Sequence, residues 1–180
     1  AAAAAARGAS TLLVTTQGPV ALPGVIAIQV DTAEEMADAV LARYDAVDVV
    51  IMAAAVADFR PKLAALEKIK KREGVPEIVL EPTPDILAVL GERKGAQVLV
   101  GFAAETERLR EDAAEKLAAK RVDLMVANDV RASDSGFEVD TNRAVLLDSS
   151  GASEELPLLT KVELAEVVWD RVARIVKSRS

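Results

Sequence analysis

Five short apolar runs alternate with stretches of helical spacing, and this alternation limits the folds open to the chain more than any other feature. The runs cover residues 10–16, 25–30, 48–55, 97–102 and 122–129. Strands that are apolar on both faces are typical of parallel sheets with helices on both sides. The pattern therefore predicts an α/β protein built on a mainly parallel sheet.

Capping signals between these runs indicate where helices begin. Thr32 and Glu35 have the spacing of a capping box, which predicts a helix ending near Arg43. Thr83 followed by Pro84 predicts the N-cap and the first residue of a second helix. The order of strands and helices indicates a Rossmann-like parallel sheet flanked by helices.

The last third of the chain adds an antiparallel element. A helix is expected over 106–120, and the stretch 137–148 reads as a hairpin that turns at 140–142. Thr160 and Glu163 form a second capping box, which begins a long final helix. The hairpin offers an exposed sheet edge, so we expect pairing with a second copy of the chain around residues 122–150.

Three segments follow predicted strands and are the first place to look for a ligand site. They are 53–58, 101–106 and 127–130, and a shorter strand is expected over 77–81. Ligands of parallel sheets bind beyond the carboxyl ends of the strands. We therefore expect the three segments to lie along one edge of the sheet.

Composition excludes several kinds of chemistry. The formal net charge is −7, which argues against a generic nucleic-acid or membrane-surface binder. The sequence has no cysteine and no histidine, so thiol nucleophiles, disulfides, Cys/His zinc sites and a histidine base are all excluded. No apolar run reaches the length of about 18 residues that a membrane helix needs. We expect a cytoplasmic protein.

The segment "MAAAVAD" (52–58) combines small residues with one acid, and a basic stretch follows it. Small side chains let a ligand approach the backbone, and Asp58 is suited to a ribose hydroxyl or a metal-bound phosphate. Alternatively, the segment is an ordinary strand end and Asp58 caps a helix. Lys68, Lys70 and Lys71 are suited to closing over a triphosphate, or else they form an ordinary solvated turn.

Further candidates come from the next two strands. Phe102 is suited to stacking on a base or walling a pocket, unless it is a core residue. Lys116 and Lys120 are four residues apart and therefore share a helix face. They are suited to contacting a phosphate or base from one side, or else they form an ordinary surface pair. Asn128 and Asp129 follow a strand, where they orient a substrate or cap a turn.

Taken in order, several of these motifs resemble one enzyme family. The segments are "AAAVADFRP", "KIKK", "PDIL", "VGFAAET", "KLAAK", "DLMVANDV" and "SGFEVDTNRAVLL". Together they resemble phosphopantothenoylcysteine synthetase, the ligase of coenzyme A biosynthesis that is often fused behind a flavin-dependent phosphopantothenoylcysteine decarboxylase. The resemblance covers the chain from about residue 10 onward.

The resemblance implies a reaction in two steps. CTP activates the carboxylate of 4′-phosphopantothenate as an acyl-cytidylate with release of pyrophosphate, and the amine of cysteine then displaces CMP. This chemistry needs no protein thiol or imidazole, in agreement with the composition. It also implies Mg²⁺ as cofactor, CTP as co-substrate and a homodimer.

The resemblance also assigns residues. Lys68 is implied to be the catalytic cation, on a mobile flap that contacts the triphosphate. The implied nucleotide-binding residues are Met52, Ala53, Ala54, Asp58, Lys68, Pro84, Asp85, Ile86, Leu87, Phe102, Lys116 and Lys120.

The N-terminal part departs from the family pattern. The family begins with a strand and a Gly-rich turn that carries an asparagine, and we expect residues 1–180 to form a single domain without them. The chain as written should then make no acyl-cytidylate. A non-catalytic nucleotide-binding or dimerisation fragment is one alternative. A nicotinamide-dependent Rossmann oxidoreductase is another, although G-x-G-x-x-G is absent and Tyr44 is followed four residues later by Asp48 rather than lysine.

Overall fold

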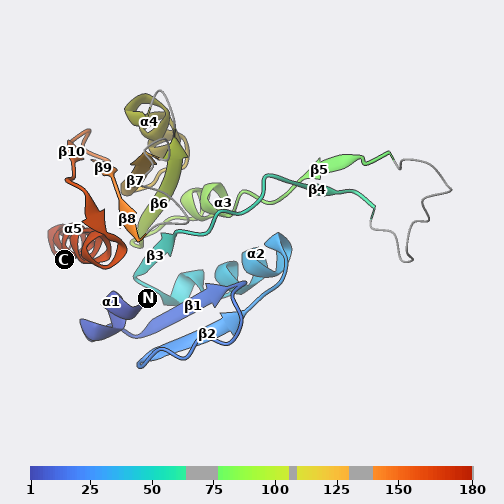
Figure 1. The fold of residues 1–180 in the computed structure, drawn as a ribbon, viewed down its shortest axis with the longest axis horizontal. Helices are drawn as coiled ribbons and strands as arrows, with labels where there is room; N and C mark the ends of the chain where they lie inside the picture. Colours follow the sequence, from blue (N-terminus) through green and yellow to red (C-terminus); the bar gives the residue numbers. More distant parts are fainter. Residues whose placement is uncertain (64–76, 106–108, 130–139, 180) are drawn as a thin grey trace.

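The computed structural model describes residues 1–63, 77–105, 109–129 and 140–179. Its largest sheet has five strands in the order β10-β9-β7-β6-β3 (Figure 1). Strands β3, β6 and β7 are parallel, and β9 and β10 continue the sheet in antiparallel pairing. The strands are β3 (Val49–Met52), β6 (Val98–Glu105), β7 (Leu124–Asp129), β9 (Ala144–Asp148) and β10 (Ser153–Glu155).

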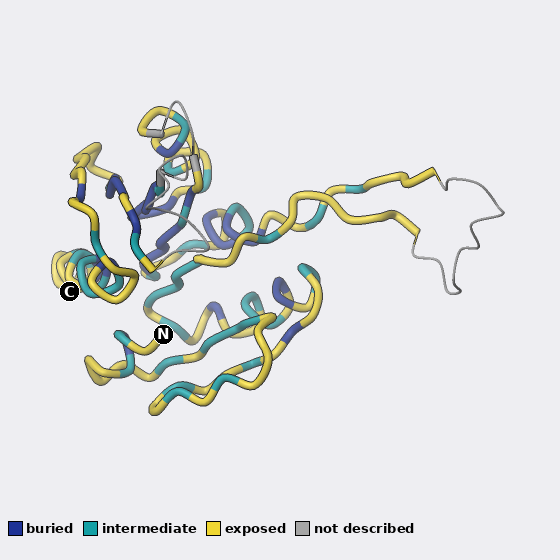
Figure 2. Tube along the Cα trace, in the orientation of Figure 1, coloured by how far each residue is buried: buried dark blue, intermediate teal, exposed yellow. Residues whose placement is uncertain are grey.

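Helices cover both faces of this sheet, as the apolar strands predict. Val98 and Val100 pack toward α5 (Lys161–Arg179), whereas Leu99 between them packs toward α3 (Ile86–Glu92) and α4 (Leu109–Ala119). The alternation follows from the period of two in a strand. Figure 2 shows buried residues concentrated along these central strands. The α/β class is therefore confirmed.

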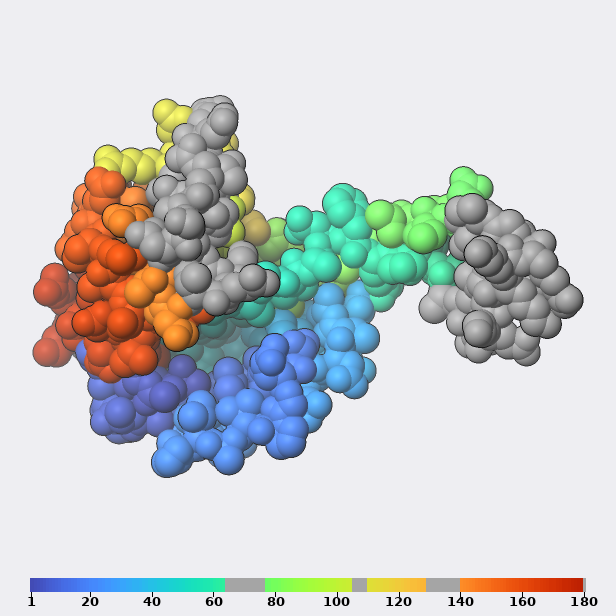
Figure 3. Space-filling model, in the orientation of Figure 1, coloured from blue at the N-terminus to red at the C-terminus, as the bar shows by residue number. Residues whose placement is uncertain are grey.

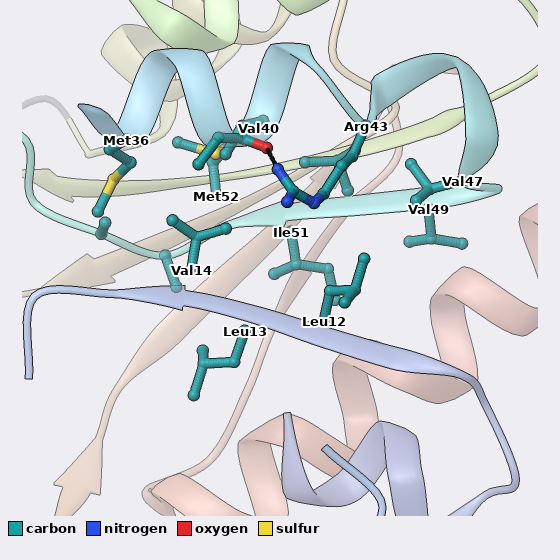
Figure 4. A pocket seen from close by; sticks show the side chains of 14 residues that line it. Leu12, Leu13, Val14, Met36, Val40, Arg43, Val47, Val49, Ile51 and Met52 are labelled. Atoms are coloured by element: carbon teal, nitrogen blue, oxygen red, sulfur yellow. Dashed lines mark hydrogen bonds between the residues drawn. The ribbon is translucent and has the colours of Figure 1, made fainter. Parts of the chain in front are cut away.

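The strands do not all join one sheet, contrary to the expectation. β1 (Thr11–Thr15) and β2 (Val25–Gln29) form a separate parallel pair, reached after a short helix, α1 (Ala2–Ala6). An apolar cavity of about 220 Å³ separates β1 from β3, and Leu12 and Ile51 project into it from opposite sides (Figure 4). No described strand pairs with either facing edge, so the two sheets stay apart.

Both predicted capping boxes are present. The Glu35 backbone N–H donates to the Thr32 hydroxyl oxygen at 3.1 Å, and α2 (Ala33–Leu41) begins there. Thr160 and Glu163 repeat the arrangement before α5, with the Glu163 N–H donating to Thr160 at 3.2 Å. Hydrogen bonds from Thr160 lower the pKa of the Glu163 carboxyl. A single 3₁₀ turn, η1 (Tyr44–Ala46), follows α2.

A two-stranded arm projects from the body (Figures 1 and 3). It pairs β4 (Phe59–Pro61) with β5 (Leu80–Pro82) in antiparallel register. Of these two strands, the sequence predicts only β5, near 77–81. Arg60 forms ion pairs with Glu81 on β5 and with Glu34 on α2, which tie the base of the arm to the body.

The expected turn at 140–142 is wrong. β8 (Thr141–Asn142) is a strand that pairs with β11 (Leu159–Thr160), and residues 137–139 lie outside the described residues. The late hairpin is β9–β10 instead. It turns where the Asp148 carboxylate accepts from the backbone N–H of Ser150 at 2.9 Å and Gly151 has φ +87°. An aspartate that hydrogen-bonds its own turn, followed by glycine, is a strong turn signal.

Candidate functional site

A cavity of about 230 Å³, here called the rim cavity, lies where β3 and β6 approach the start of α3. It joins residues from four separate stretches of the chain. Nucleotide-binding residues implied by the sequence supply much of its lining: Met52, Ala54, Asp58, Pro84, Asp85, Ile86, Leu87, Phe102 and Lys120. Ala55, Val56, Ala57 and Thr83 complete it.

Three of the implied residues are not part of this lining. Ala53 lines cavities on either side of β3 instead. Lys116 is exposed on α4 and does not reach the cavity. Lys68 lies outside the described residues, as do Lys70 and Lys71. The structure thus brings together the strand-end residues, while the basic stretch remains a prediction.

Thr83 joins two walls of the rim cavity rather than capping α3. Its backbone N–H donates to the carbonyl of Asp58 at 3.0 Å, and its hydroxyl donates to the carbonyl of Ala57. The predicted N-cap is therefore wrong, because Asp85 has that role and accepts from the Ala88 N–H at 3.0 Å. Aspartate is among the best N-cap residues, and the Thr83 hydroxyl is already engaged.

Lys120 is the cation of the rim cavity, and Asp85 holds it. The Lys120 Nζ lies 2.9 Å from one carboxylate oxygen of Asp85 and 3.1 Å from the other. Partial burial raises the pKa of Asp85, but hydrogen bonds from Lys120 and from the Ala88 N–H outweigh it, so this pKa lies below its ordinary value. The pair holds the Lys120 ammonium group in the lining of the cavity, with its charge balanced by Asp85.

Gly91 explains why Lys120 can reach Asp85. A Cβ on Gly91 would lie 2.0 Å from the backbone carbonyl oxygen of Lys120, so only glycine lets α3 approach the end of α4 this closely. Sequence reasoning missed this residue. The signal was a glycine inside a helix, which costs about 1 kcal/mol relative to alanine and therefore indicates a packing reason.

The Asp58 carboxylate is exposed at the rim cavity, and no hydrogen bond or ion pair joins it to another described residue. The described residues contain no cluster of three or more carboxylates that would hold a metal ion by itself. Mg²⁺ in nucleotide sites is commonly bound by one or two carboxylates together with phosphate oxygens. Asp58 fits that limited role.

The cavity between β1 and β3 has a different character. Its lining is apolar apart from Arg43, whose guanidinium donates to the carbonyl of Ala39 at 2.9 Å (Figure 4). It therefore offers little to orient a charged nucleotide. The rim cavity, with Asp58 and Lys120, is the better candidate.

Comparison with known proteins places the chain in a family. Residues 1–176 match the model of the DNA/pantothenate metabolism flavoprotein C-terminal domain. The chain belongs to this family. The family resemblance drawn from the ordered motifs is thereby confirmed.

Sequence similarity to individual proteins supports the family assignment. The chain is 45% identical over 174 residues to the Coenzyme A biosynthesis bifunctional protein CoaBC of Bacillus subtilis (strain 168), covering 94% of this chain and 42% of that protein. It is 39% identical over 179 residues to a Cysteine/Cysteine sulfinic acid decarboxylase of an unknown prokaryotic organism, covering 97% of this chain and 49% of that protein. The chain thus spans less than half of either relative.

A solved member shares the fold. The crystal structure of the C-terminal domain of CoaBC matches with a TM-score of 0.82 and 38% identity, over 98% of this chain and 81% of that one. A match over nearly the whole chain includes the parallel core strands on which the rim cavity depends. In the present chain, no helix among the described residues has the length and apolar character needed to cross a bilayer.

Proposed function

We propose that this chain is the phosphopantothenate–cysteine ligase domain of a coenzyme A biosynthesis protein and that it uses CTP. The observation that carries the proposal is the rim cavity. There, residues from four separated motifs of the resemblance surround one space next to Asp58 and Lys120. The family match and the CoaBC relatives support the same reaction.

The proposed reaction balances without a protein nucleophile. A carboxylate oxygen of 4′-phosphopantothenate attacks the α-phosphorus of CTP, and the bond to pyrophosphate breaks. The amine of cysteine then attacks the acyl carbon, CMP leaves, and the amine proton passes to solvent. Mg²⁺ bound with CTP would supply charge neutralisation at the phosphates.

The residues of the rim cavity have separate tasks in this proposal. The small side chains of Ala54–Ala57 let the nucleotide approach the backbone. Lys120 offsets phosphate charge from the position that Asp85 gives it. Asp58 binds the ribose or the Mg²⁺ that accompanies CTP. The role of Lys68 as the cation for departing pyrophosphate rests on the resemblance.

We also propose a cytoplasmic homodimer in which the flavin-dependent decarboxylase is fused or associated. Relatives named as bifunctional proteins support the association, because the present chain matches less than half of their length. Light scattering at micromolar concentration tests the dimer, and a monomeric mass would contradict it.

Calorimetry tests the nucleotide site. Mg²⁺-CTP should bind the 180-residue chain and NADPH should not, with ATP as the comparison for base selectivity. Asp58→Ala should weaken CTP binding by about 1–3 kcal/mol, the range for losing a charged partner. Equal CTP affinity in both proteins would remove Asp58 from the site, and tighter binding of NADPH would favour the oxidoreductase alternative.

Turnover tests the reaction itself. The assay is phosphopantothenate-dependent release of pyrophosphate from CTP. In that assay, Lys68→Ala should lower kcat by about 10²–10³-fold, the usual effect of removing an electrostatic donor, and should affect CTP affinity less. Lys71→Ala is the control, and equal damage in both variants would reduce the stretch to a general basic patch.

A further inference from the structure

The segment 54–58, which carries Asp58, has open space on both sides. It has no regular secondary structure, and residues 54–57 line the rim cavity on one side and a cavity of about 560 Å³ on the other. Residues 31–33 and Met36, at the start of α2, line the far side of that second cavity. Close packing normally fixes a segment in place, and here it is missing on both sides. Other contacts must therefore hold Asp58 at the rim cavity.

Arg60 supplies such a contact on the side of α2. It lies on β4, two residues after Asp58, at the base of the arm (Figure 1). Its guanidinium lies 2.5 Å from the Glu34 carboxylate of α2 and 2.8 Å from the Glu81 carboxylate of β5. The bonds of Thr83 hold the same segment from the side of α3. Arg60 therefore ties the strand that leaves the segment to α2 and to β5 at once.

The Glu34 carboxylate depends on this ion pair. Its Oε1 atom is buried, and the Arg60 guanidinium is the cation beside it. A buried carboxylate oxygen is costly unless a cation or a donor compensates it. A planar guanidinium presents donors on several nitrogens and serves two carboxylates, whereas a lysine ammonium is a compact point charge. Arginine is thus the residue suited to bridging Glu34 and Glu81.

We propose that Arg60 is a positioning residue for the nucleotide site. By joining Glu34 to Glu81, it holds the segment 54–58 against α2 and keeps the carboxylate of Asp58 at the rim cavity. Neither Arg60 nor Glu34 is part of the lining of that cavity, so both act through the segment. This assignment rests on the proposed function, because CTP is the ligand whose affinity depends on the position of Asp58.

A double-mutant cycle measured as Mg²⁺-CTP affinity by calorimetry tests the proposal. Glu34→Ala should weaken binding about two- to fivefold, the range for an ion pair near the surface. Arg60→Ala should weaken it about tenfold, because both ion pairs are lost. The double variant should bind like Arg60→Ala, since Glu34 acts through Arg60.

Conservative variants separate the position of Asp58 from the stability of α2. Glu34→Asp keeps an acid in the first turn of the helix, where it interacts favourably with the helix dipole, but its side chain is one methylene shorter and does not reach Arg60. It should bind CTP as weakly as Glu34→Ala, while its Tm stays near the wild-type value. Arg60→Lys should restore only part of the affinity that Arg60→Ala loses, because an ammonium group bridges two carboxylates poorly.

Arg7 offers a matched control, because it also bridges two acids and is not part of the rim cavity. Its guanidinium lies 2.5 Å from Glu166 and 2.8 Å from Asp170, both on α5. Arg7→Ala should lower Tm to an extent similar to Arg60→Ala and should leave CTP affinity unchanged.

The backbone amide of Thr83 reports the position of the segment without any ligand. It donates to the Asp58 carbonyl at 3.0 Å, so its exchange with solvent, followed by NMR, depends on how firmly the segment is held. Exchange should be faster in Glu34→Ala than in the wild type and unchanged in Arg7→Ala.

Two results would overturn the proposal. One is a loss of CTP affinity in the double variant that equals the two single losses combined, and the other is wild-type CTP affinity together with wild-type Thr83 exchange in Glu34→Ala. If the wild-type protein does not bind Mg²⁺-CTP, the proposed nucleotide site fails. Faster Thr83 exchange in Glu34→Ala would then still support the hold of Arg60 on the segment 54–58.

Discussion

At the amino end of the five-stranded sheet, the buried carboxylate of Asp123 is surrounded by donors, whereas at the carboxyl end the buried oxygens of Asn128 and Asn142 have none among the described residues. Asp123 accepts from the Lys94 Nζ at 2.5 Å, from the Leu99 N–H at 2.8 Å and from Arg179. At the amino end, the buried carboxylate has hydrogen-bond partners within the chain. At the carboxyl end, the two buried amide oxygens have none among the described residues. The contrast separates a buried group whose hydrogen bonds are made within the chain from buried groups that have no such bonds among the described residues.

Of the substitutions predicted here, removal of the Asp123 carboxylate should have the largest effect on stability. Asp123→Ala leaves the Lys94 ammonium, which is only 13% exposed, without its carboxylate. Loss of one partner of a buried pair costs about 3–5 kcal/mol, so the free energy of unfolding in urea should fall by that amount. The CTP affinity of the folded fraction should not change. A loss below about 1 kcal/mol would show that this end of the sheet does not carry stability.

Gly91→Ala tests how closely the walls of the rim cavity must approach. The new Cβ would overlap the Lys120 carbonyl, so α3 has to move, at a cost of about 1–3 kcal/mol in unfolding free energy. CTP affinity should fall as well, because Lys120 loses its position beside Asp85. Gly18→Ala is the control, since a Cβ added there would meet nothing within 4 Å. Equal behaviour of the two variants would contradict the packing argument.

Thr83→Val should have a smaller effect, and that effect should be on CTP affinity. It keeps the shape of the side chain but removes the hydrogen bond to Ala57, so CTP affinity should fall by about three- to tenfold. Thr83→Ser should restore most of it. Thr11→Val removes a similar bond, in which the hydroxyl donates to the Ala9 carbonyl at 3.0 Å, far from the rim cavity. If both valine variants bind CTP like the wild type, the bridge has no role in the site.

The Asp85–Lys120 pair should give the smallest effect, one visible through pH. The pKa of Asp85 is below its ordinary value in the folded protein, so the unfolded chain binds more protons as the pH falls. The stabilisation is present above the ordinary aspartate pKa of about 3.9 and is lost as the pH falls through the folded value. Asp85→Asn should therefore lose less stability between about pH 6 and pH 3. Since half of the Asp85 side chain is exposed, the difference will be modest.

Sequence patterns predicted the helix starts and the core strands. The capping boxes at Thr32 and Thr160 and the apolar strands of the core are as expected, because each depends on residues close together in the chain. The convergence of Asp58 and Phe102 on one cavity followed from the rule for parallel strands, whereas Lys120 was expected there from the family resemblance.

Features that depend on contacts between distant residues were beyond such rules. Thr83 had the composition of an N-cap, but its hydroxyl finds Ala57, which is 26 residues away. β8 read as a turn because its partner, β11, lies far along the sequence. Nothing local marked Asn142 as buried without a partner, since that property depends on how α5 covers the sheet.

The contact at Gly91 also has a mechanical consequence. α3 and the end of α4 touch through backbone atoms, and Lys94 adds a hydrogen bond to the Arg121 carbonyl at 2.9 Å, so these two walls of the rim cavity move as one body. The facing wall, residues 54–58, is joined to them through the two bonds of Thr83. Any widening of the rim cavity that keeps the contact between α3 and α4 must therefore displace residues 54–58, and that displacement has to break the bonds of Thr83.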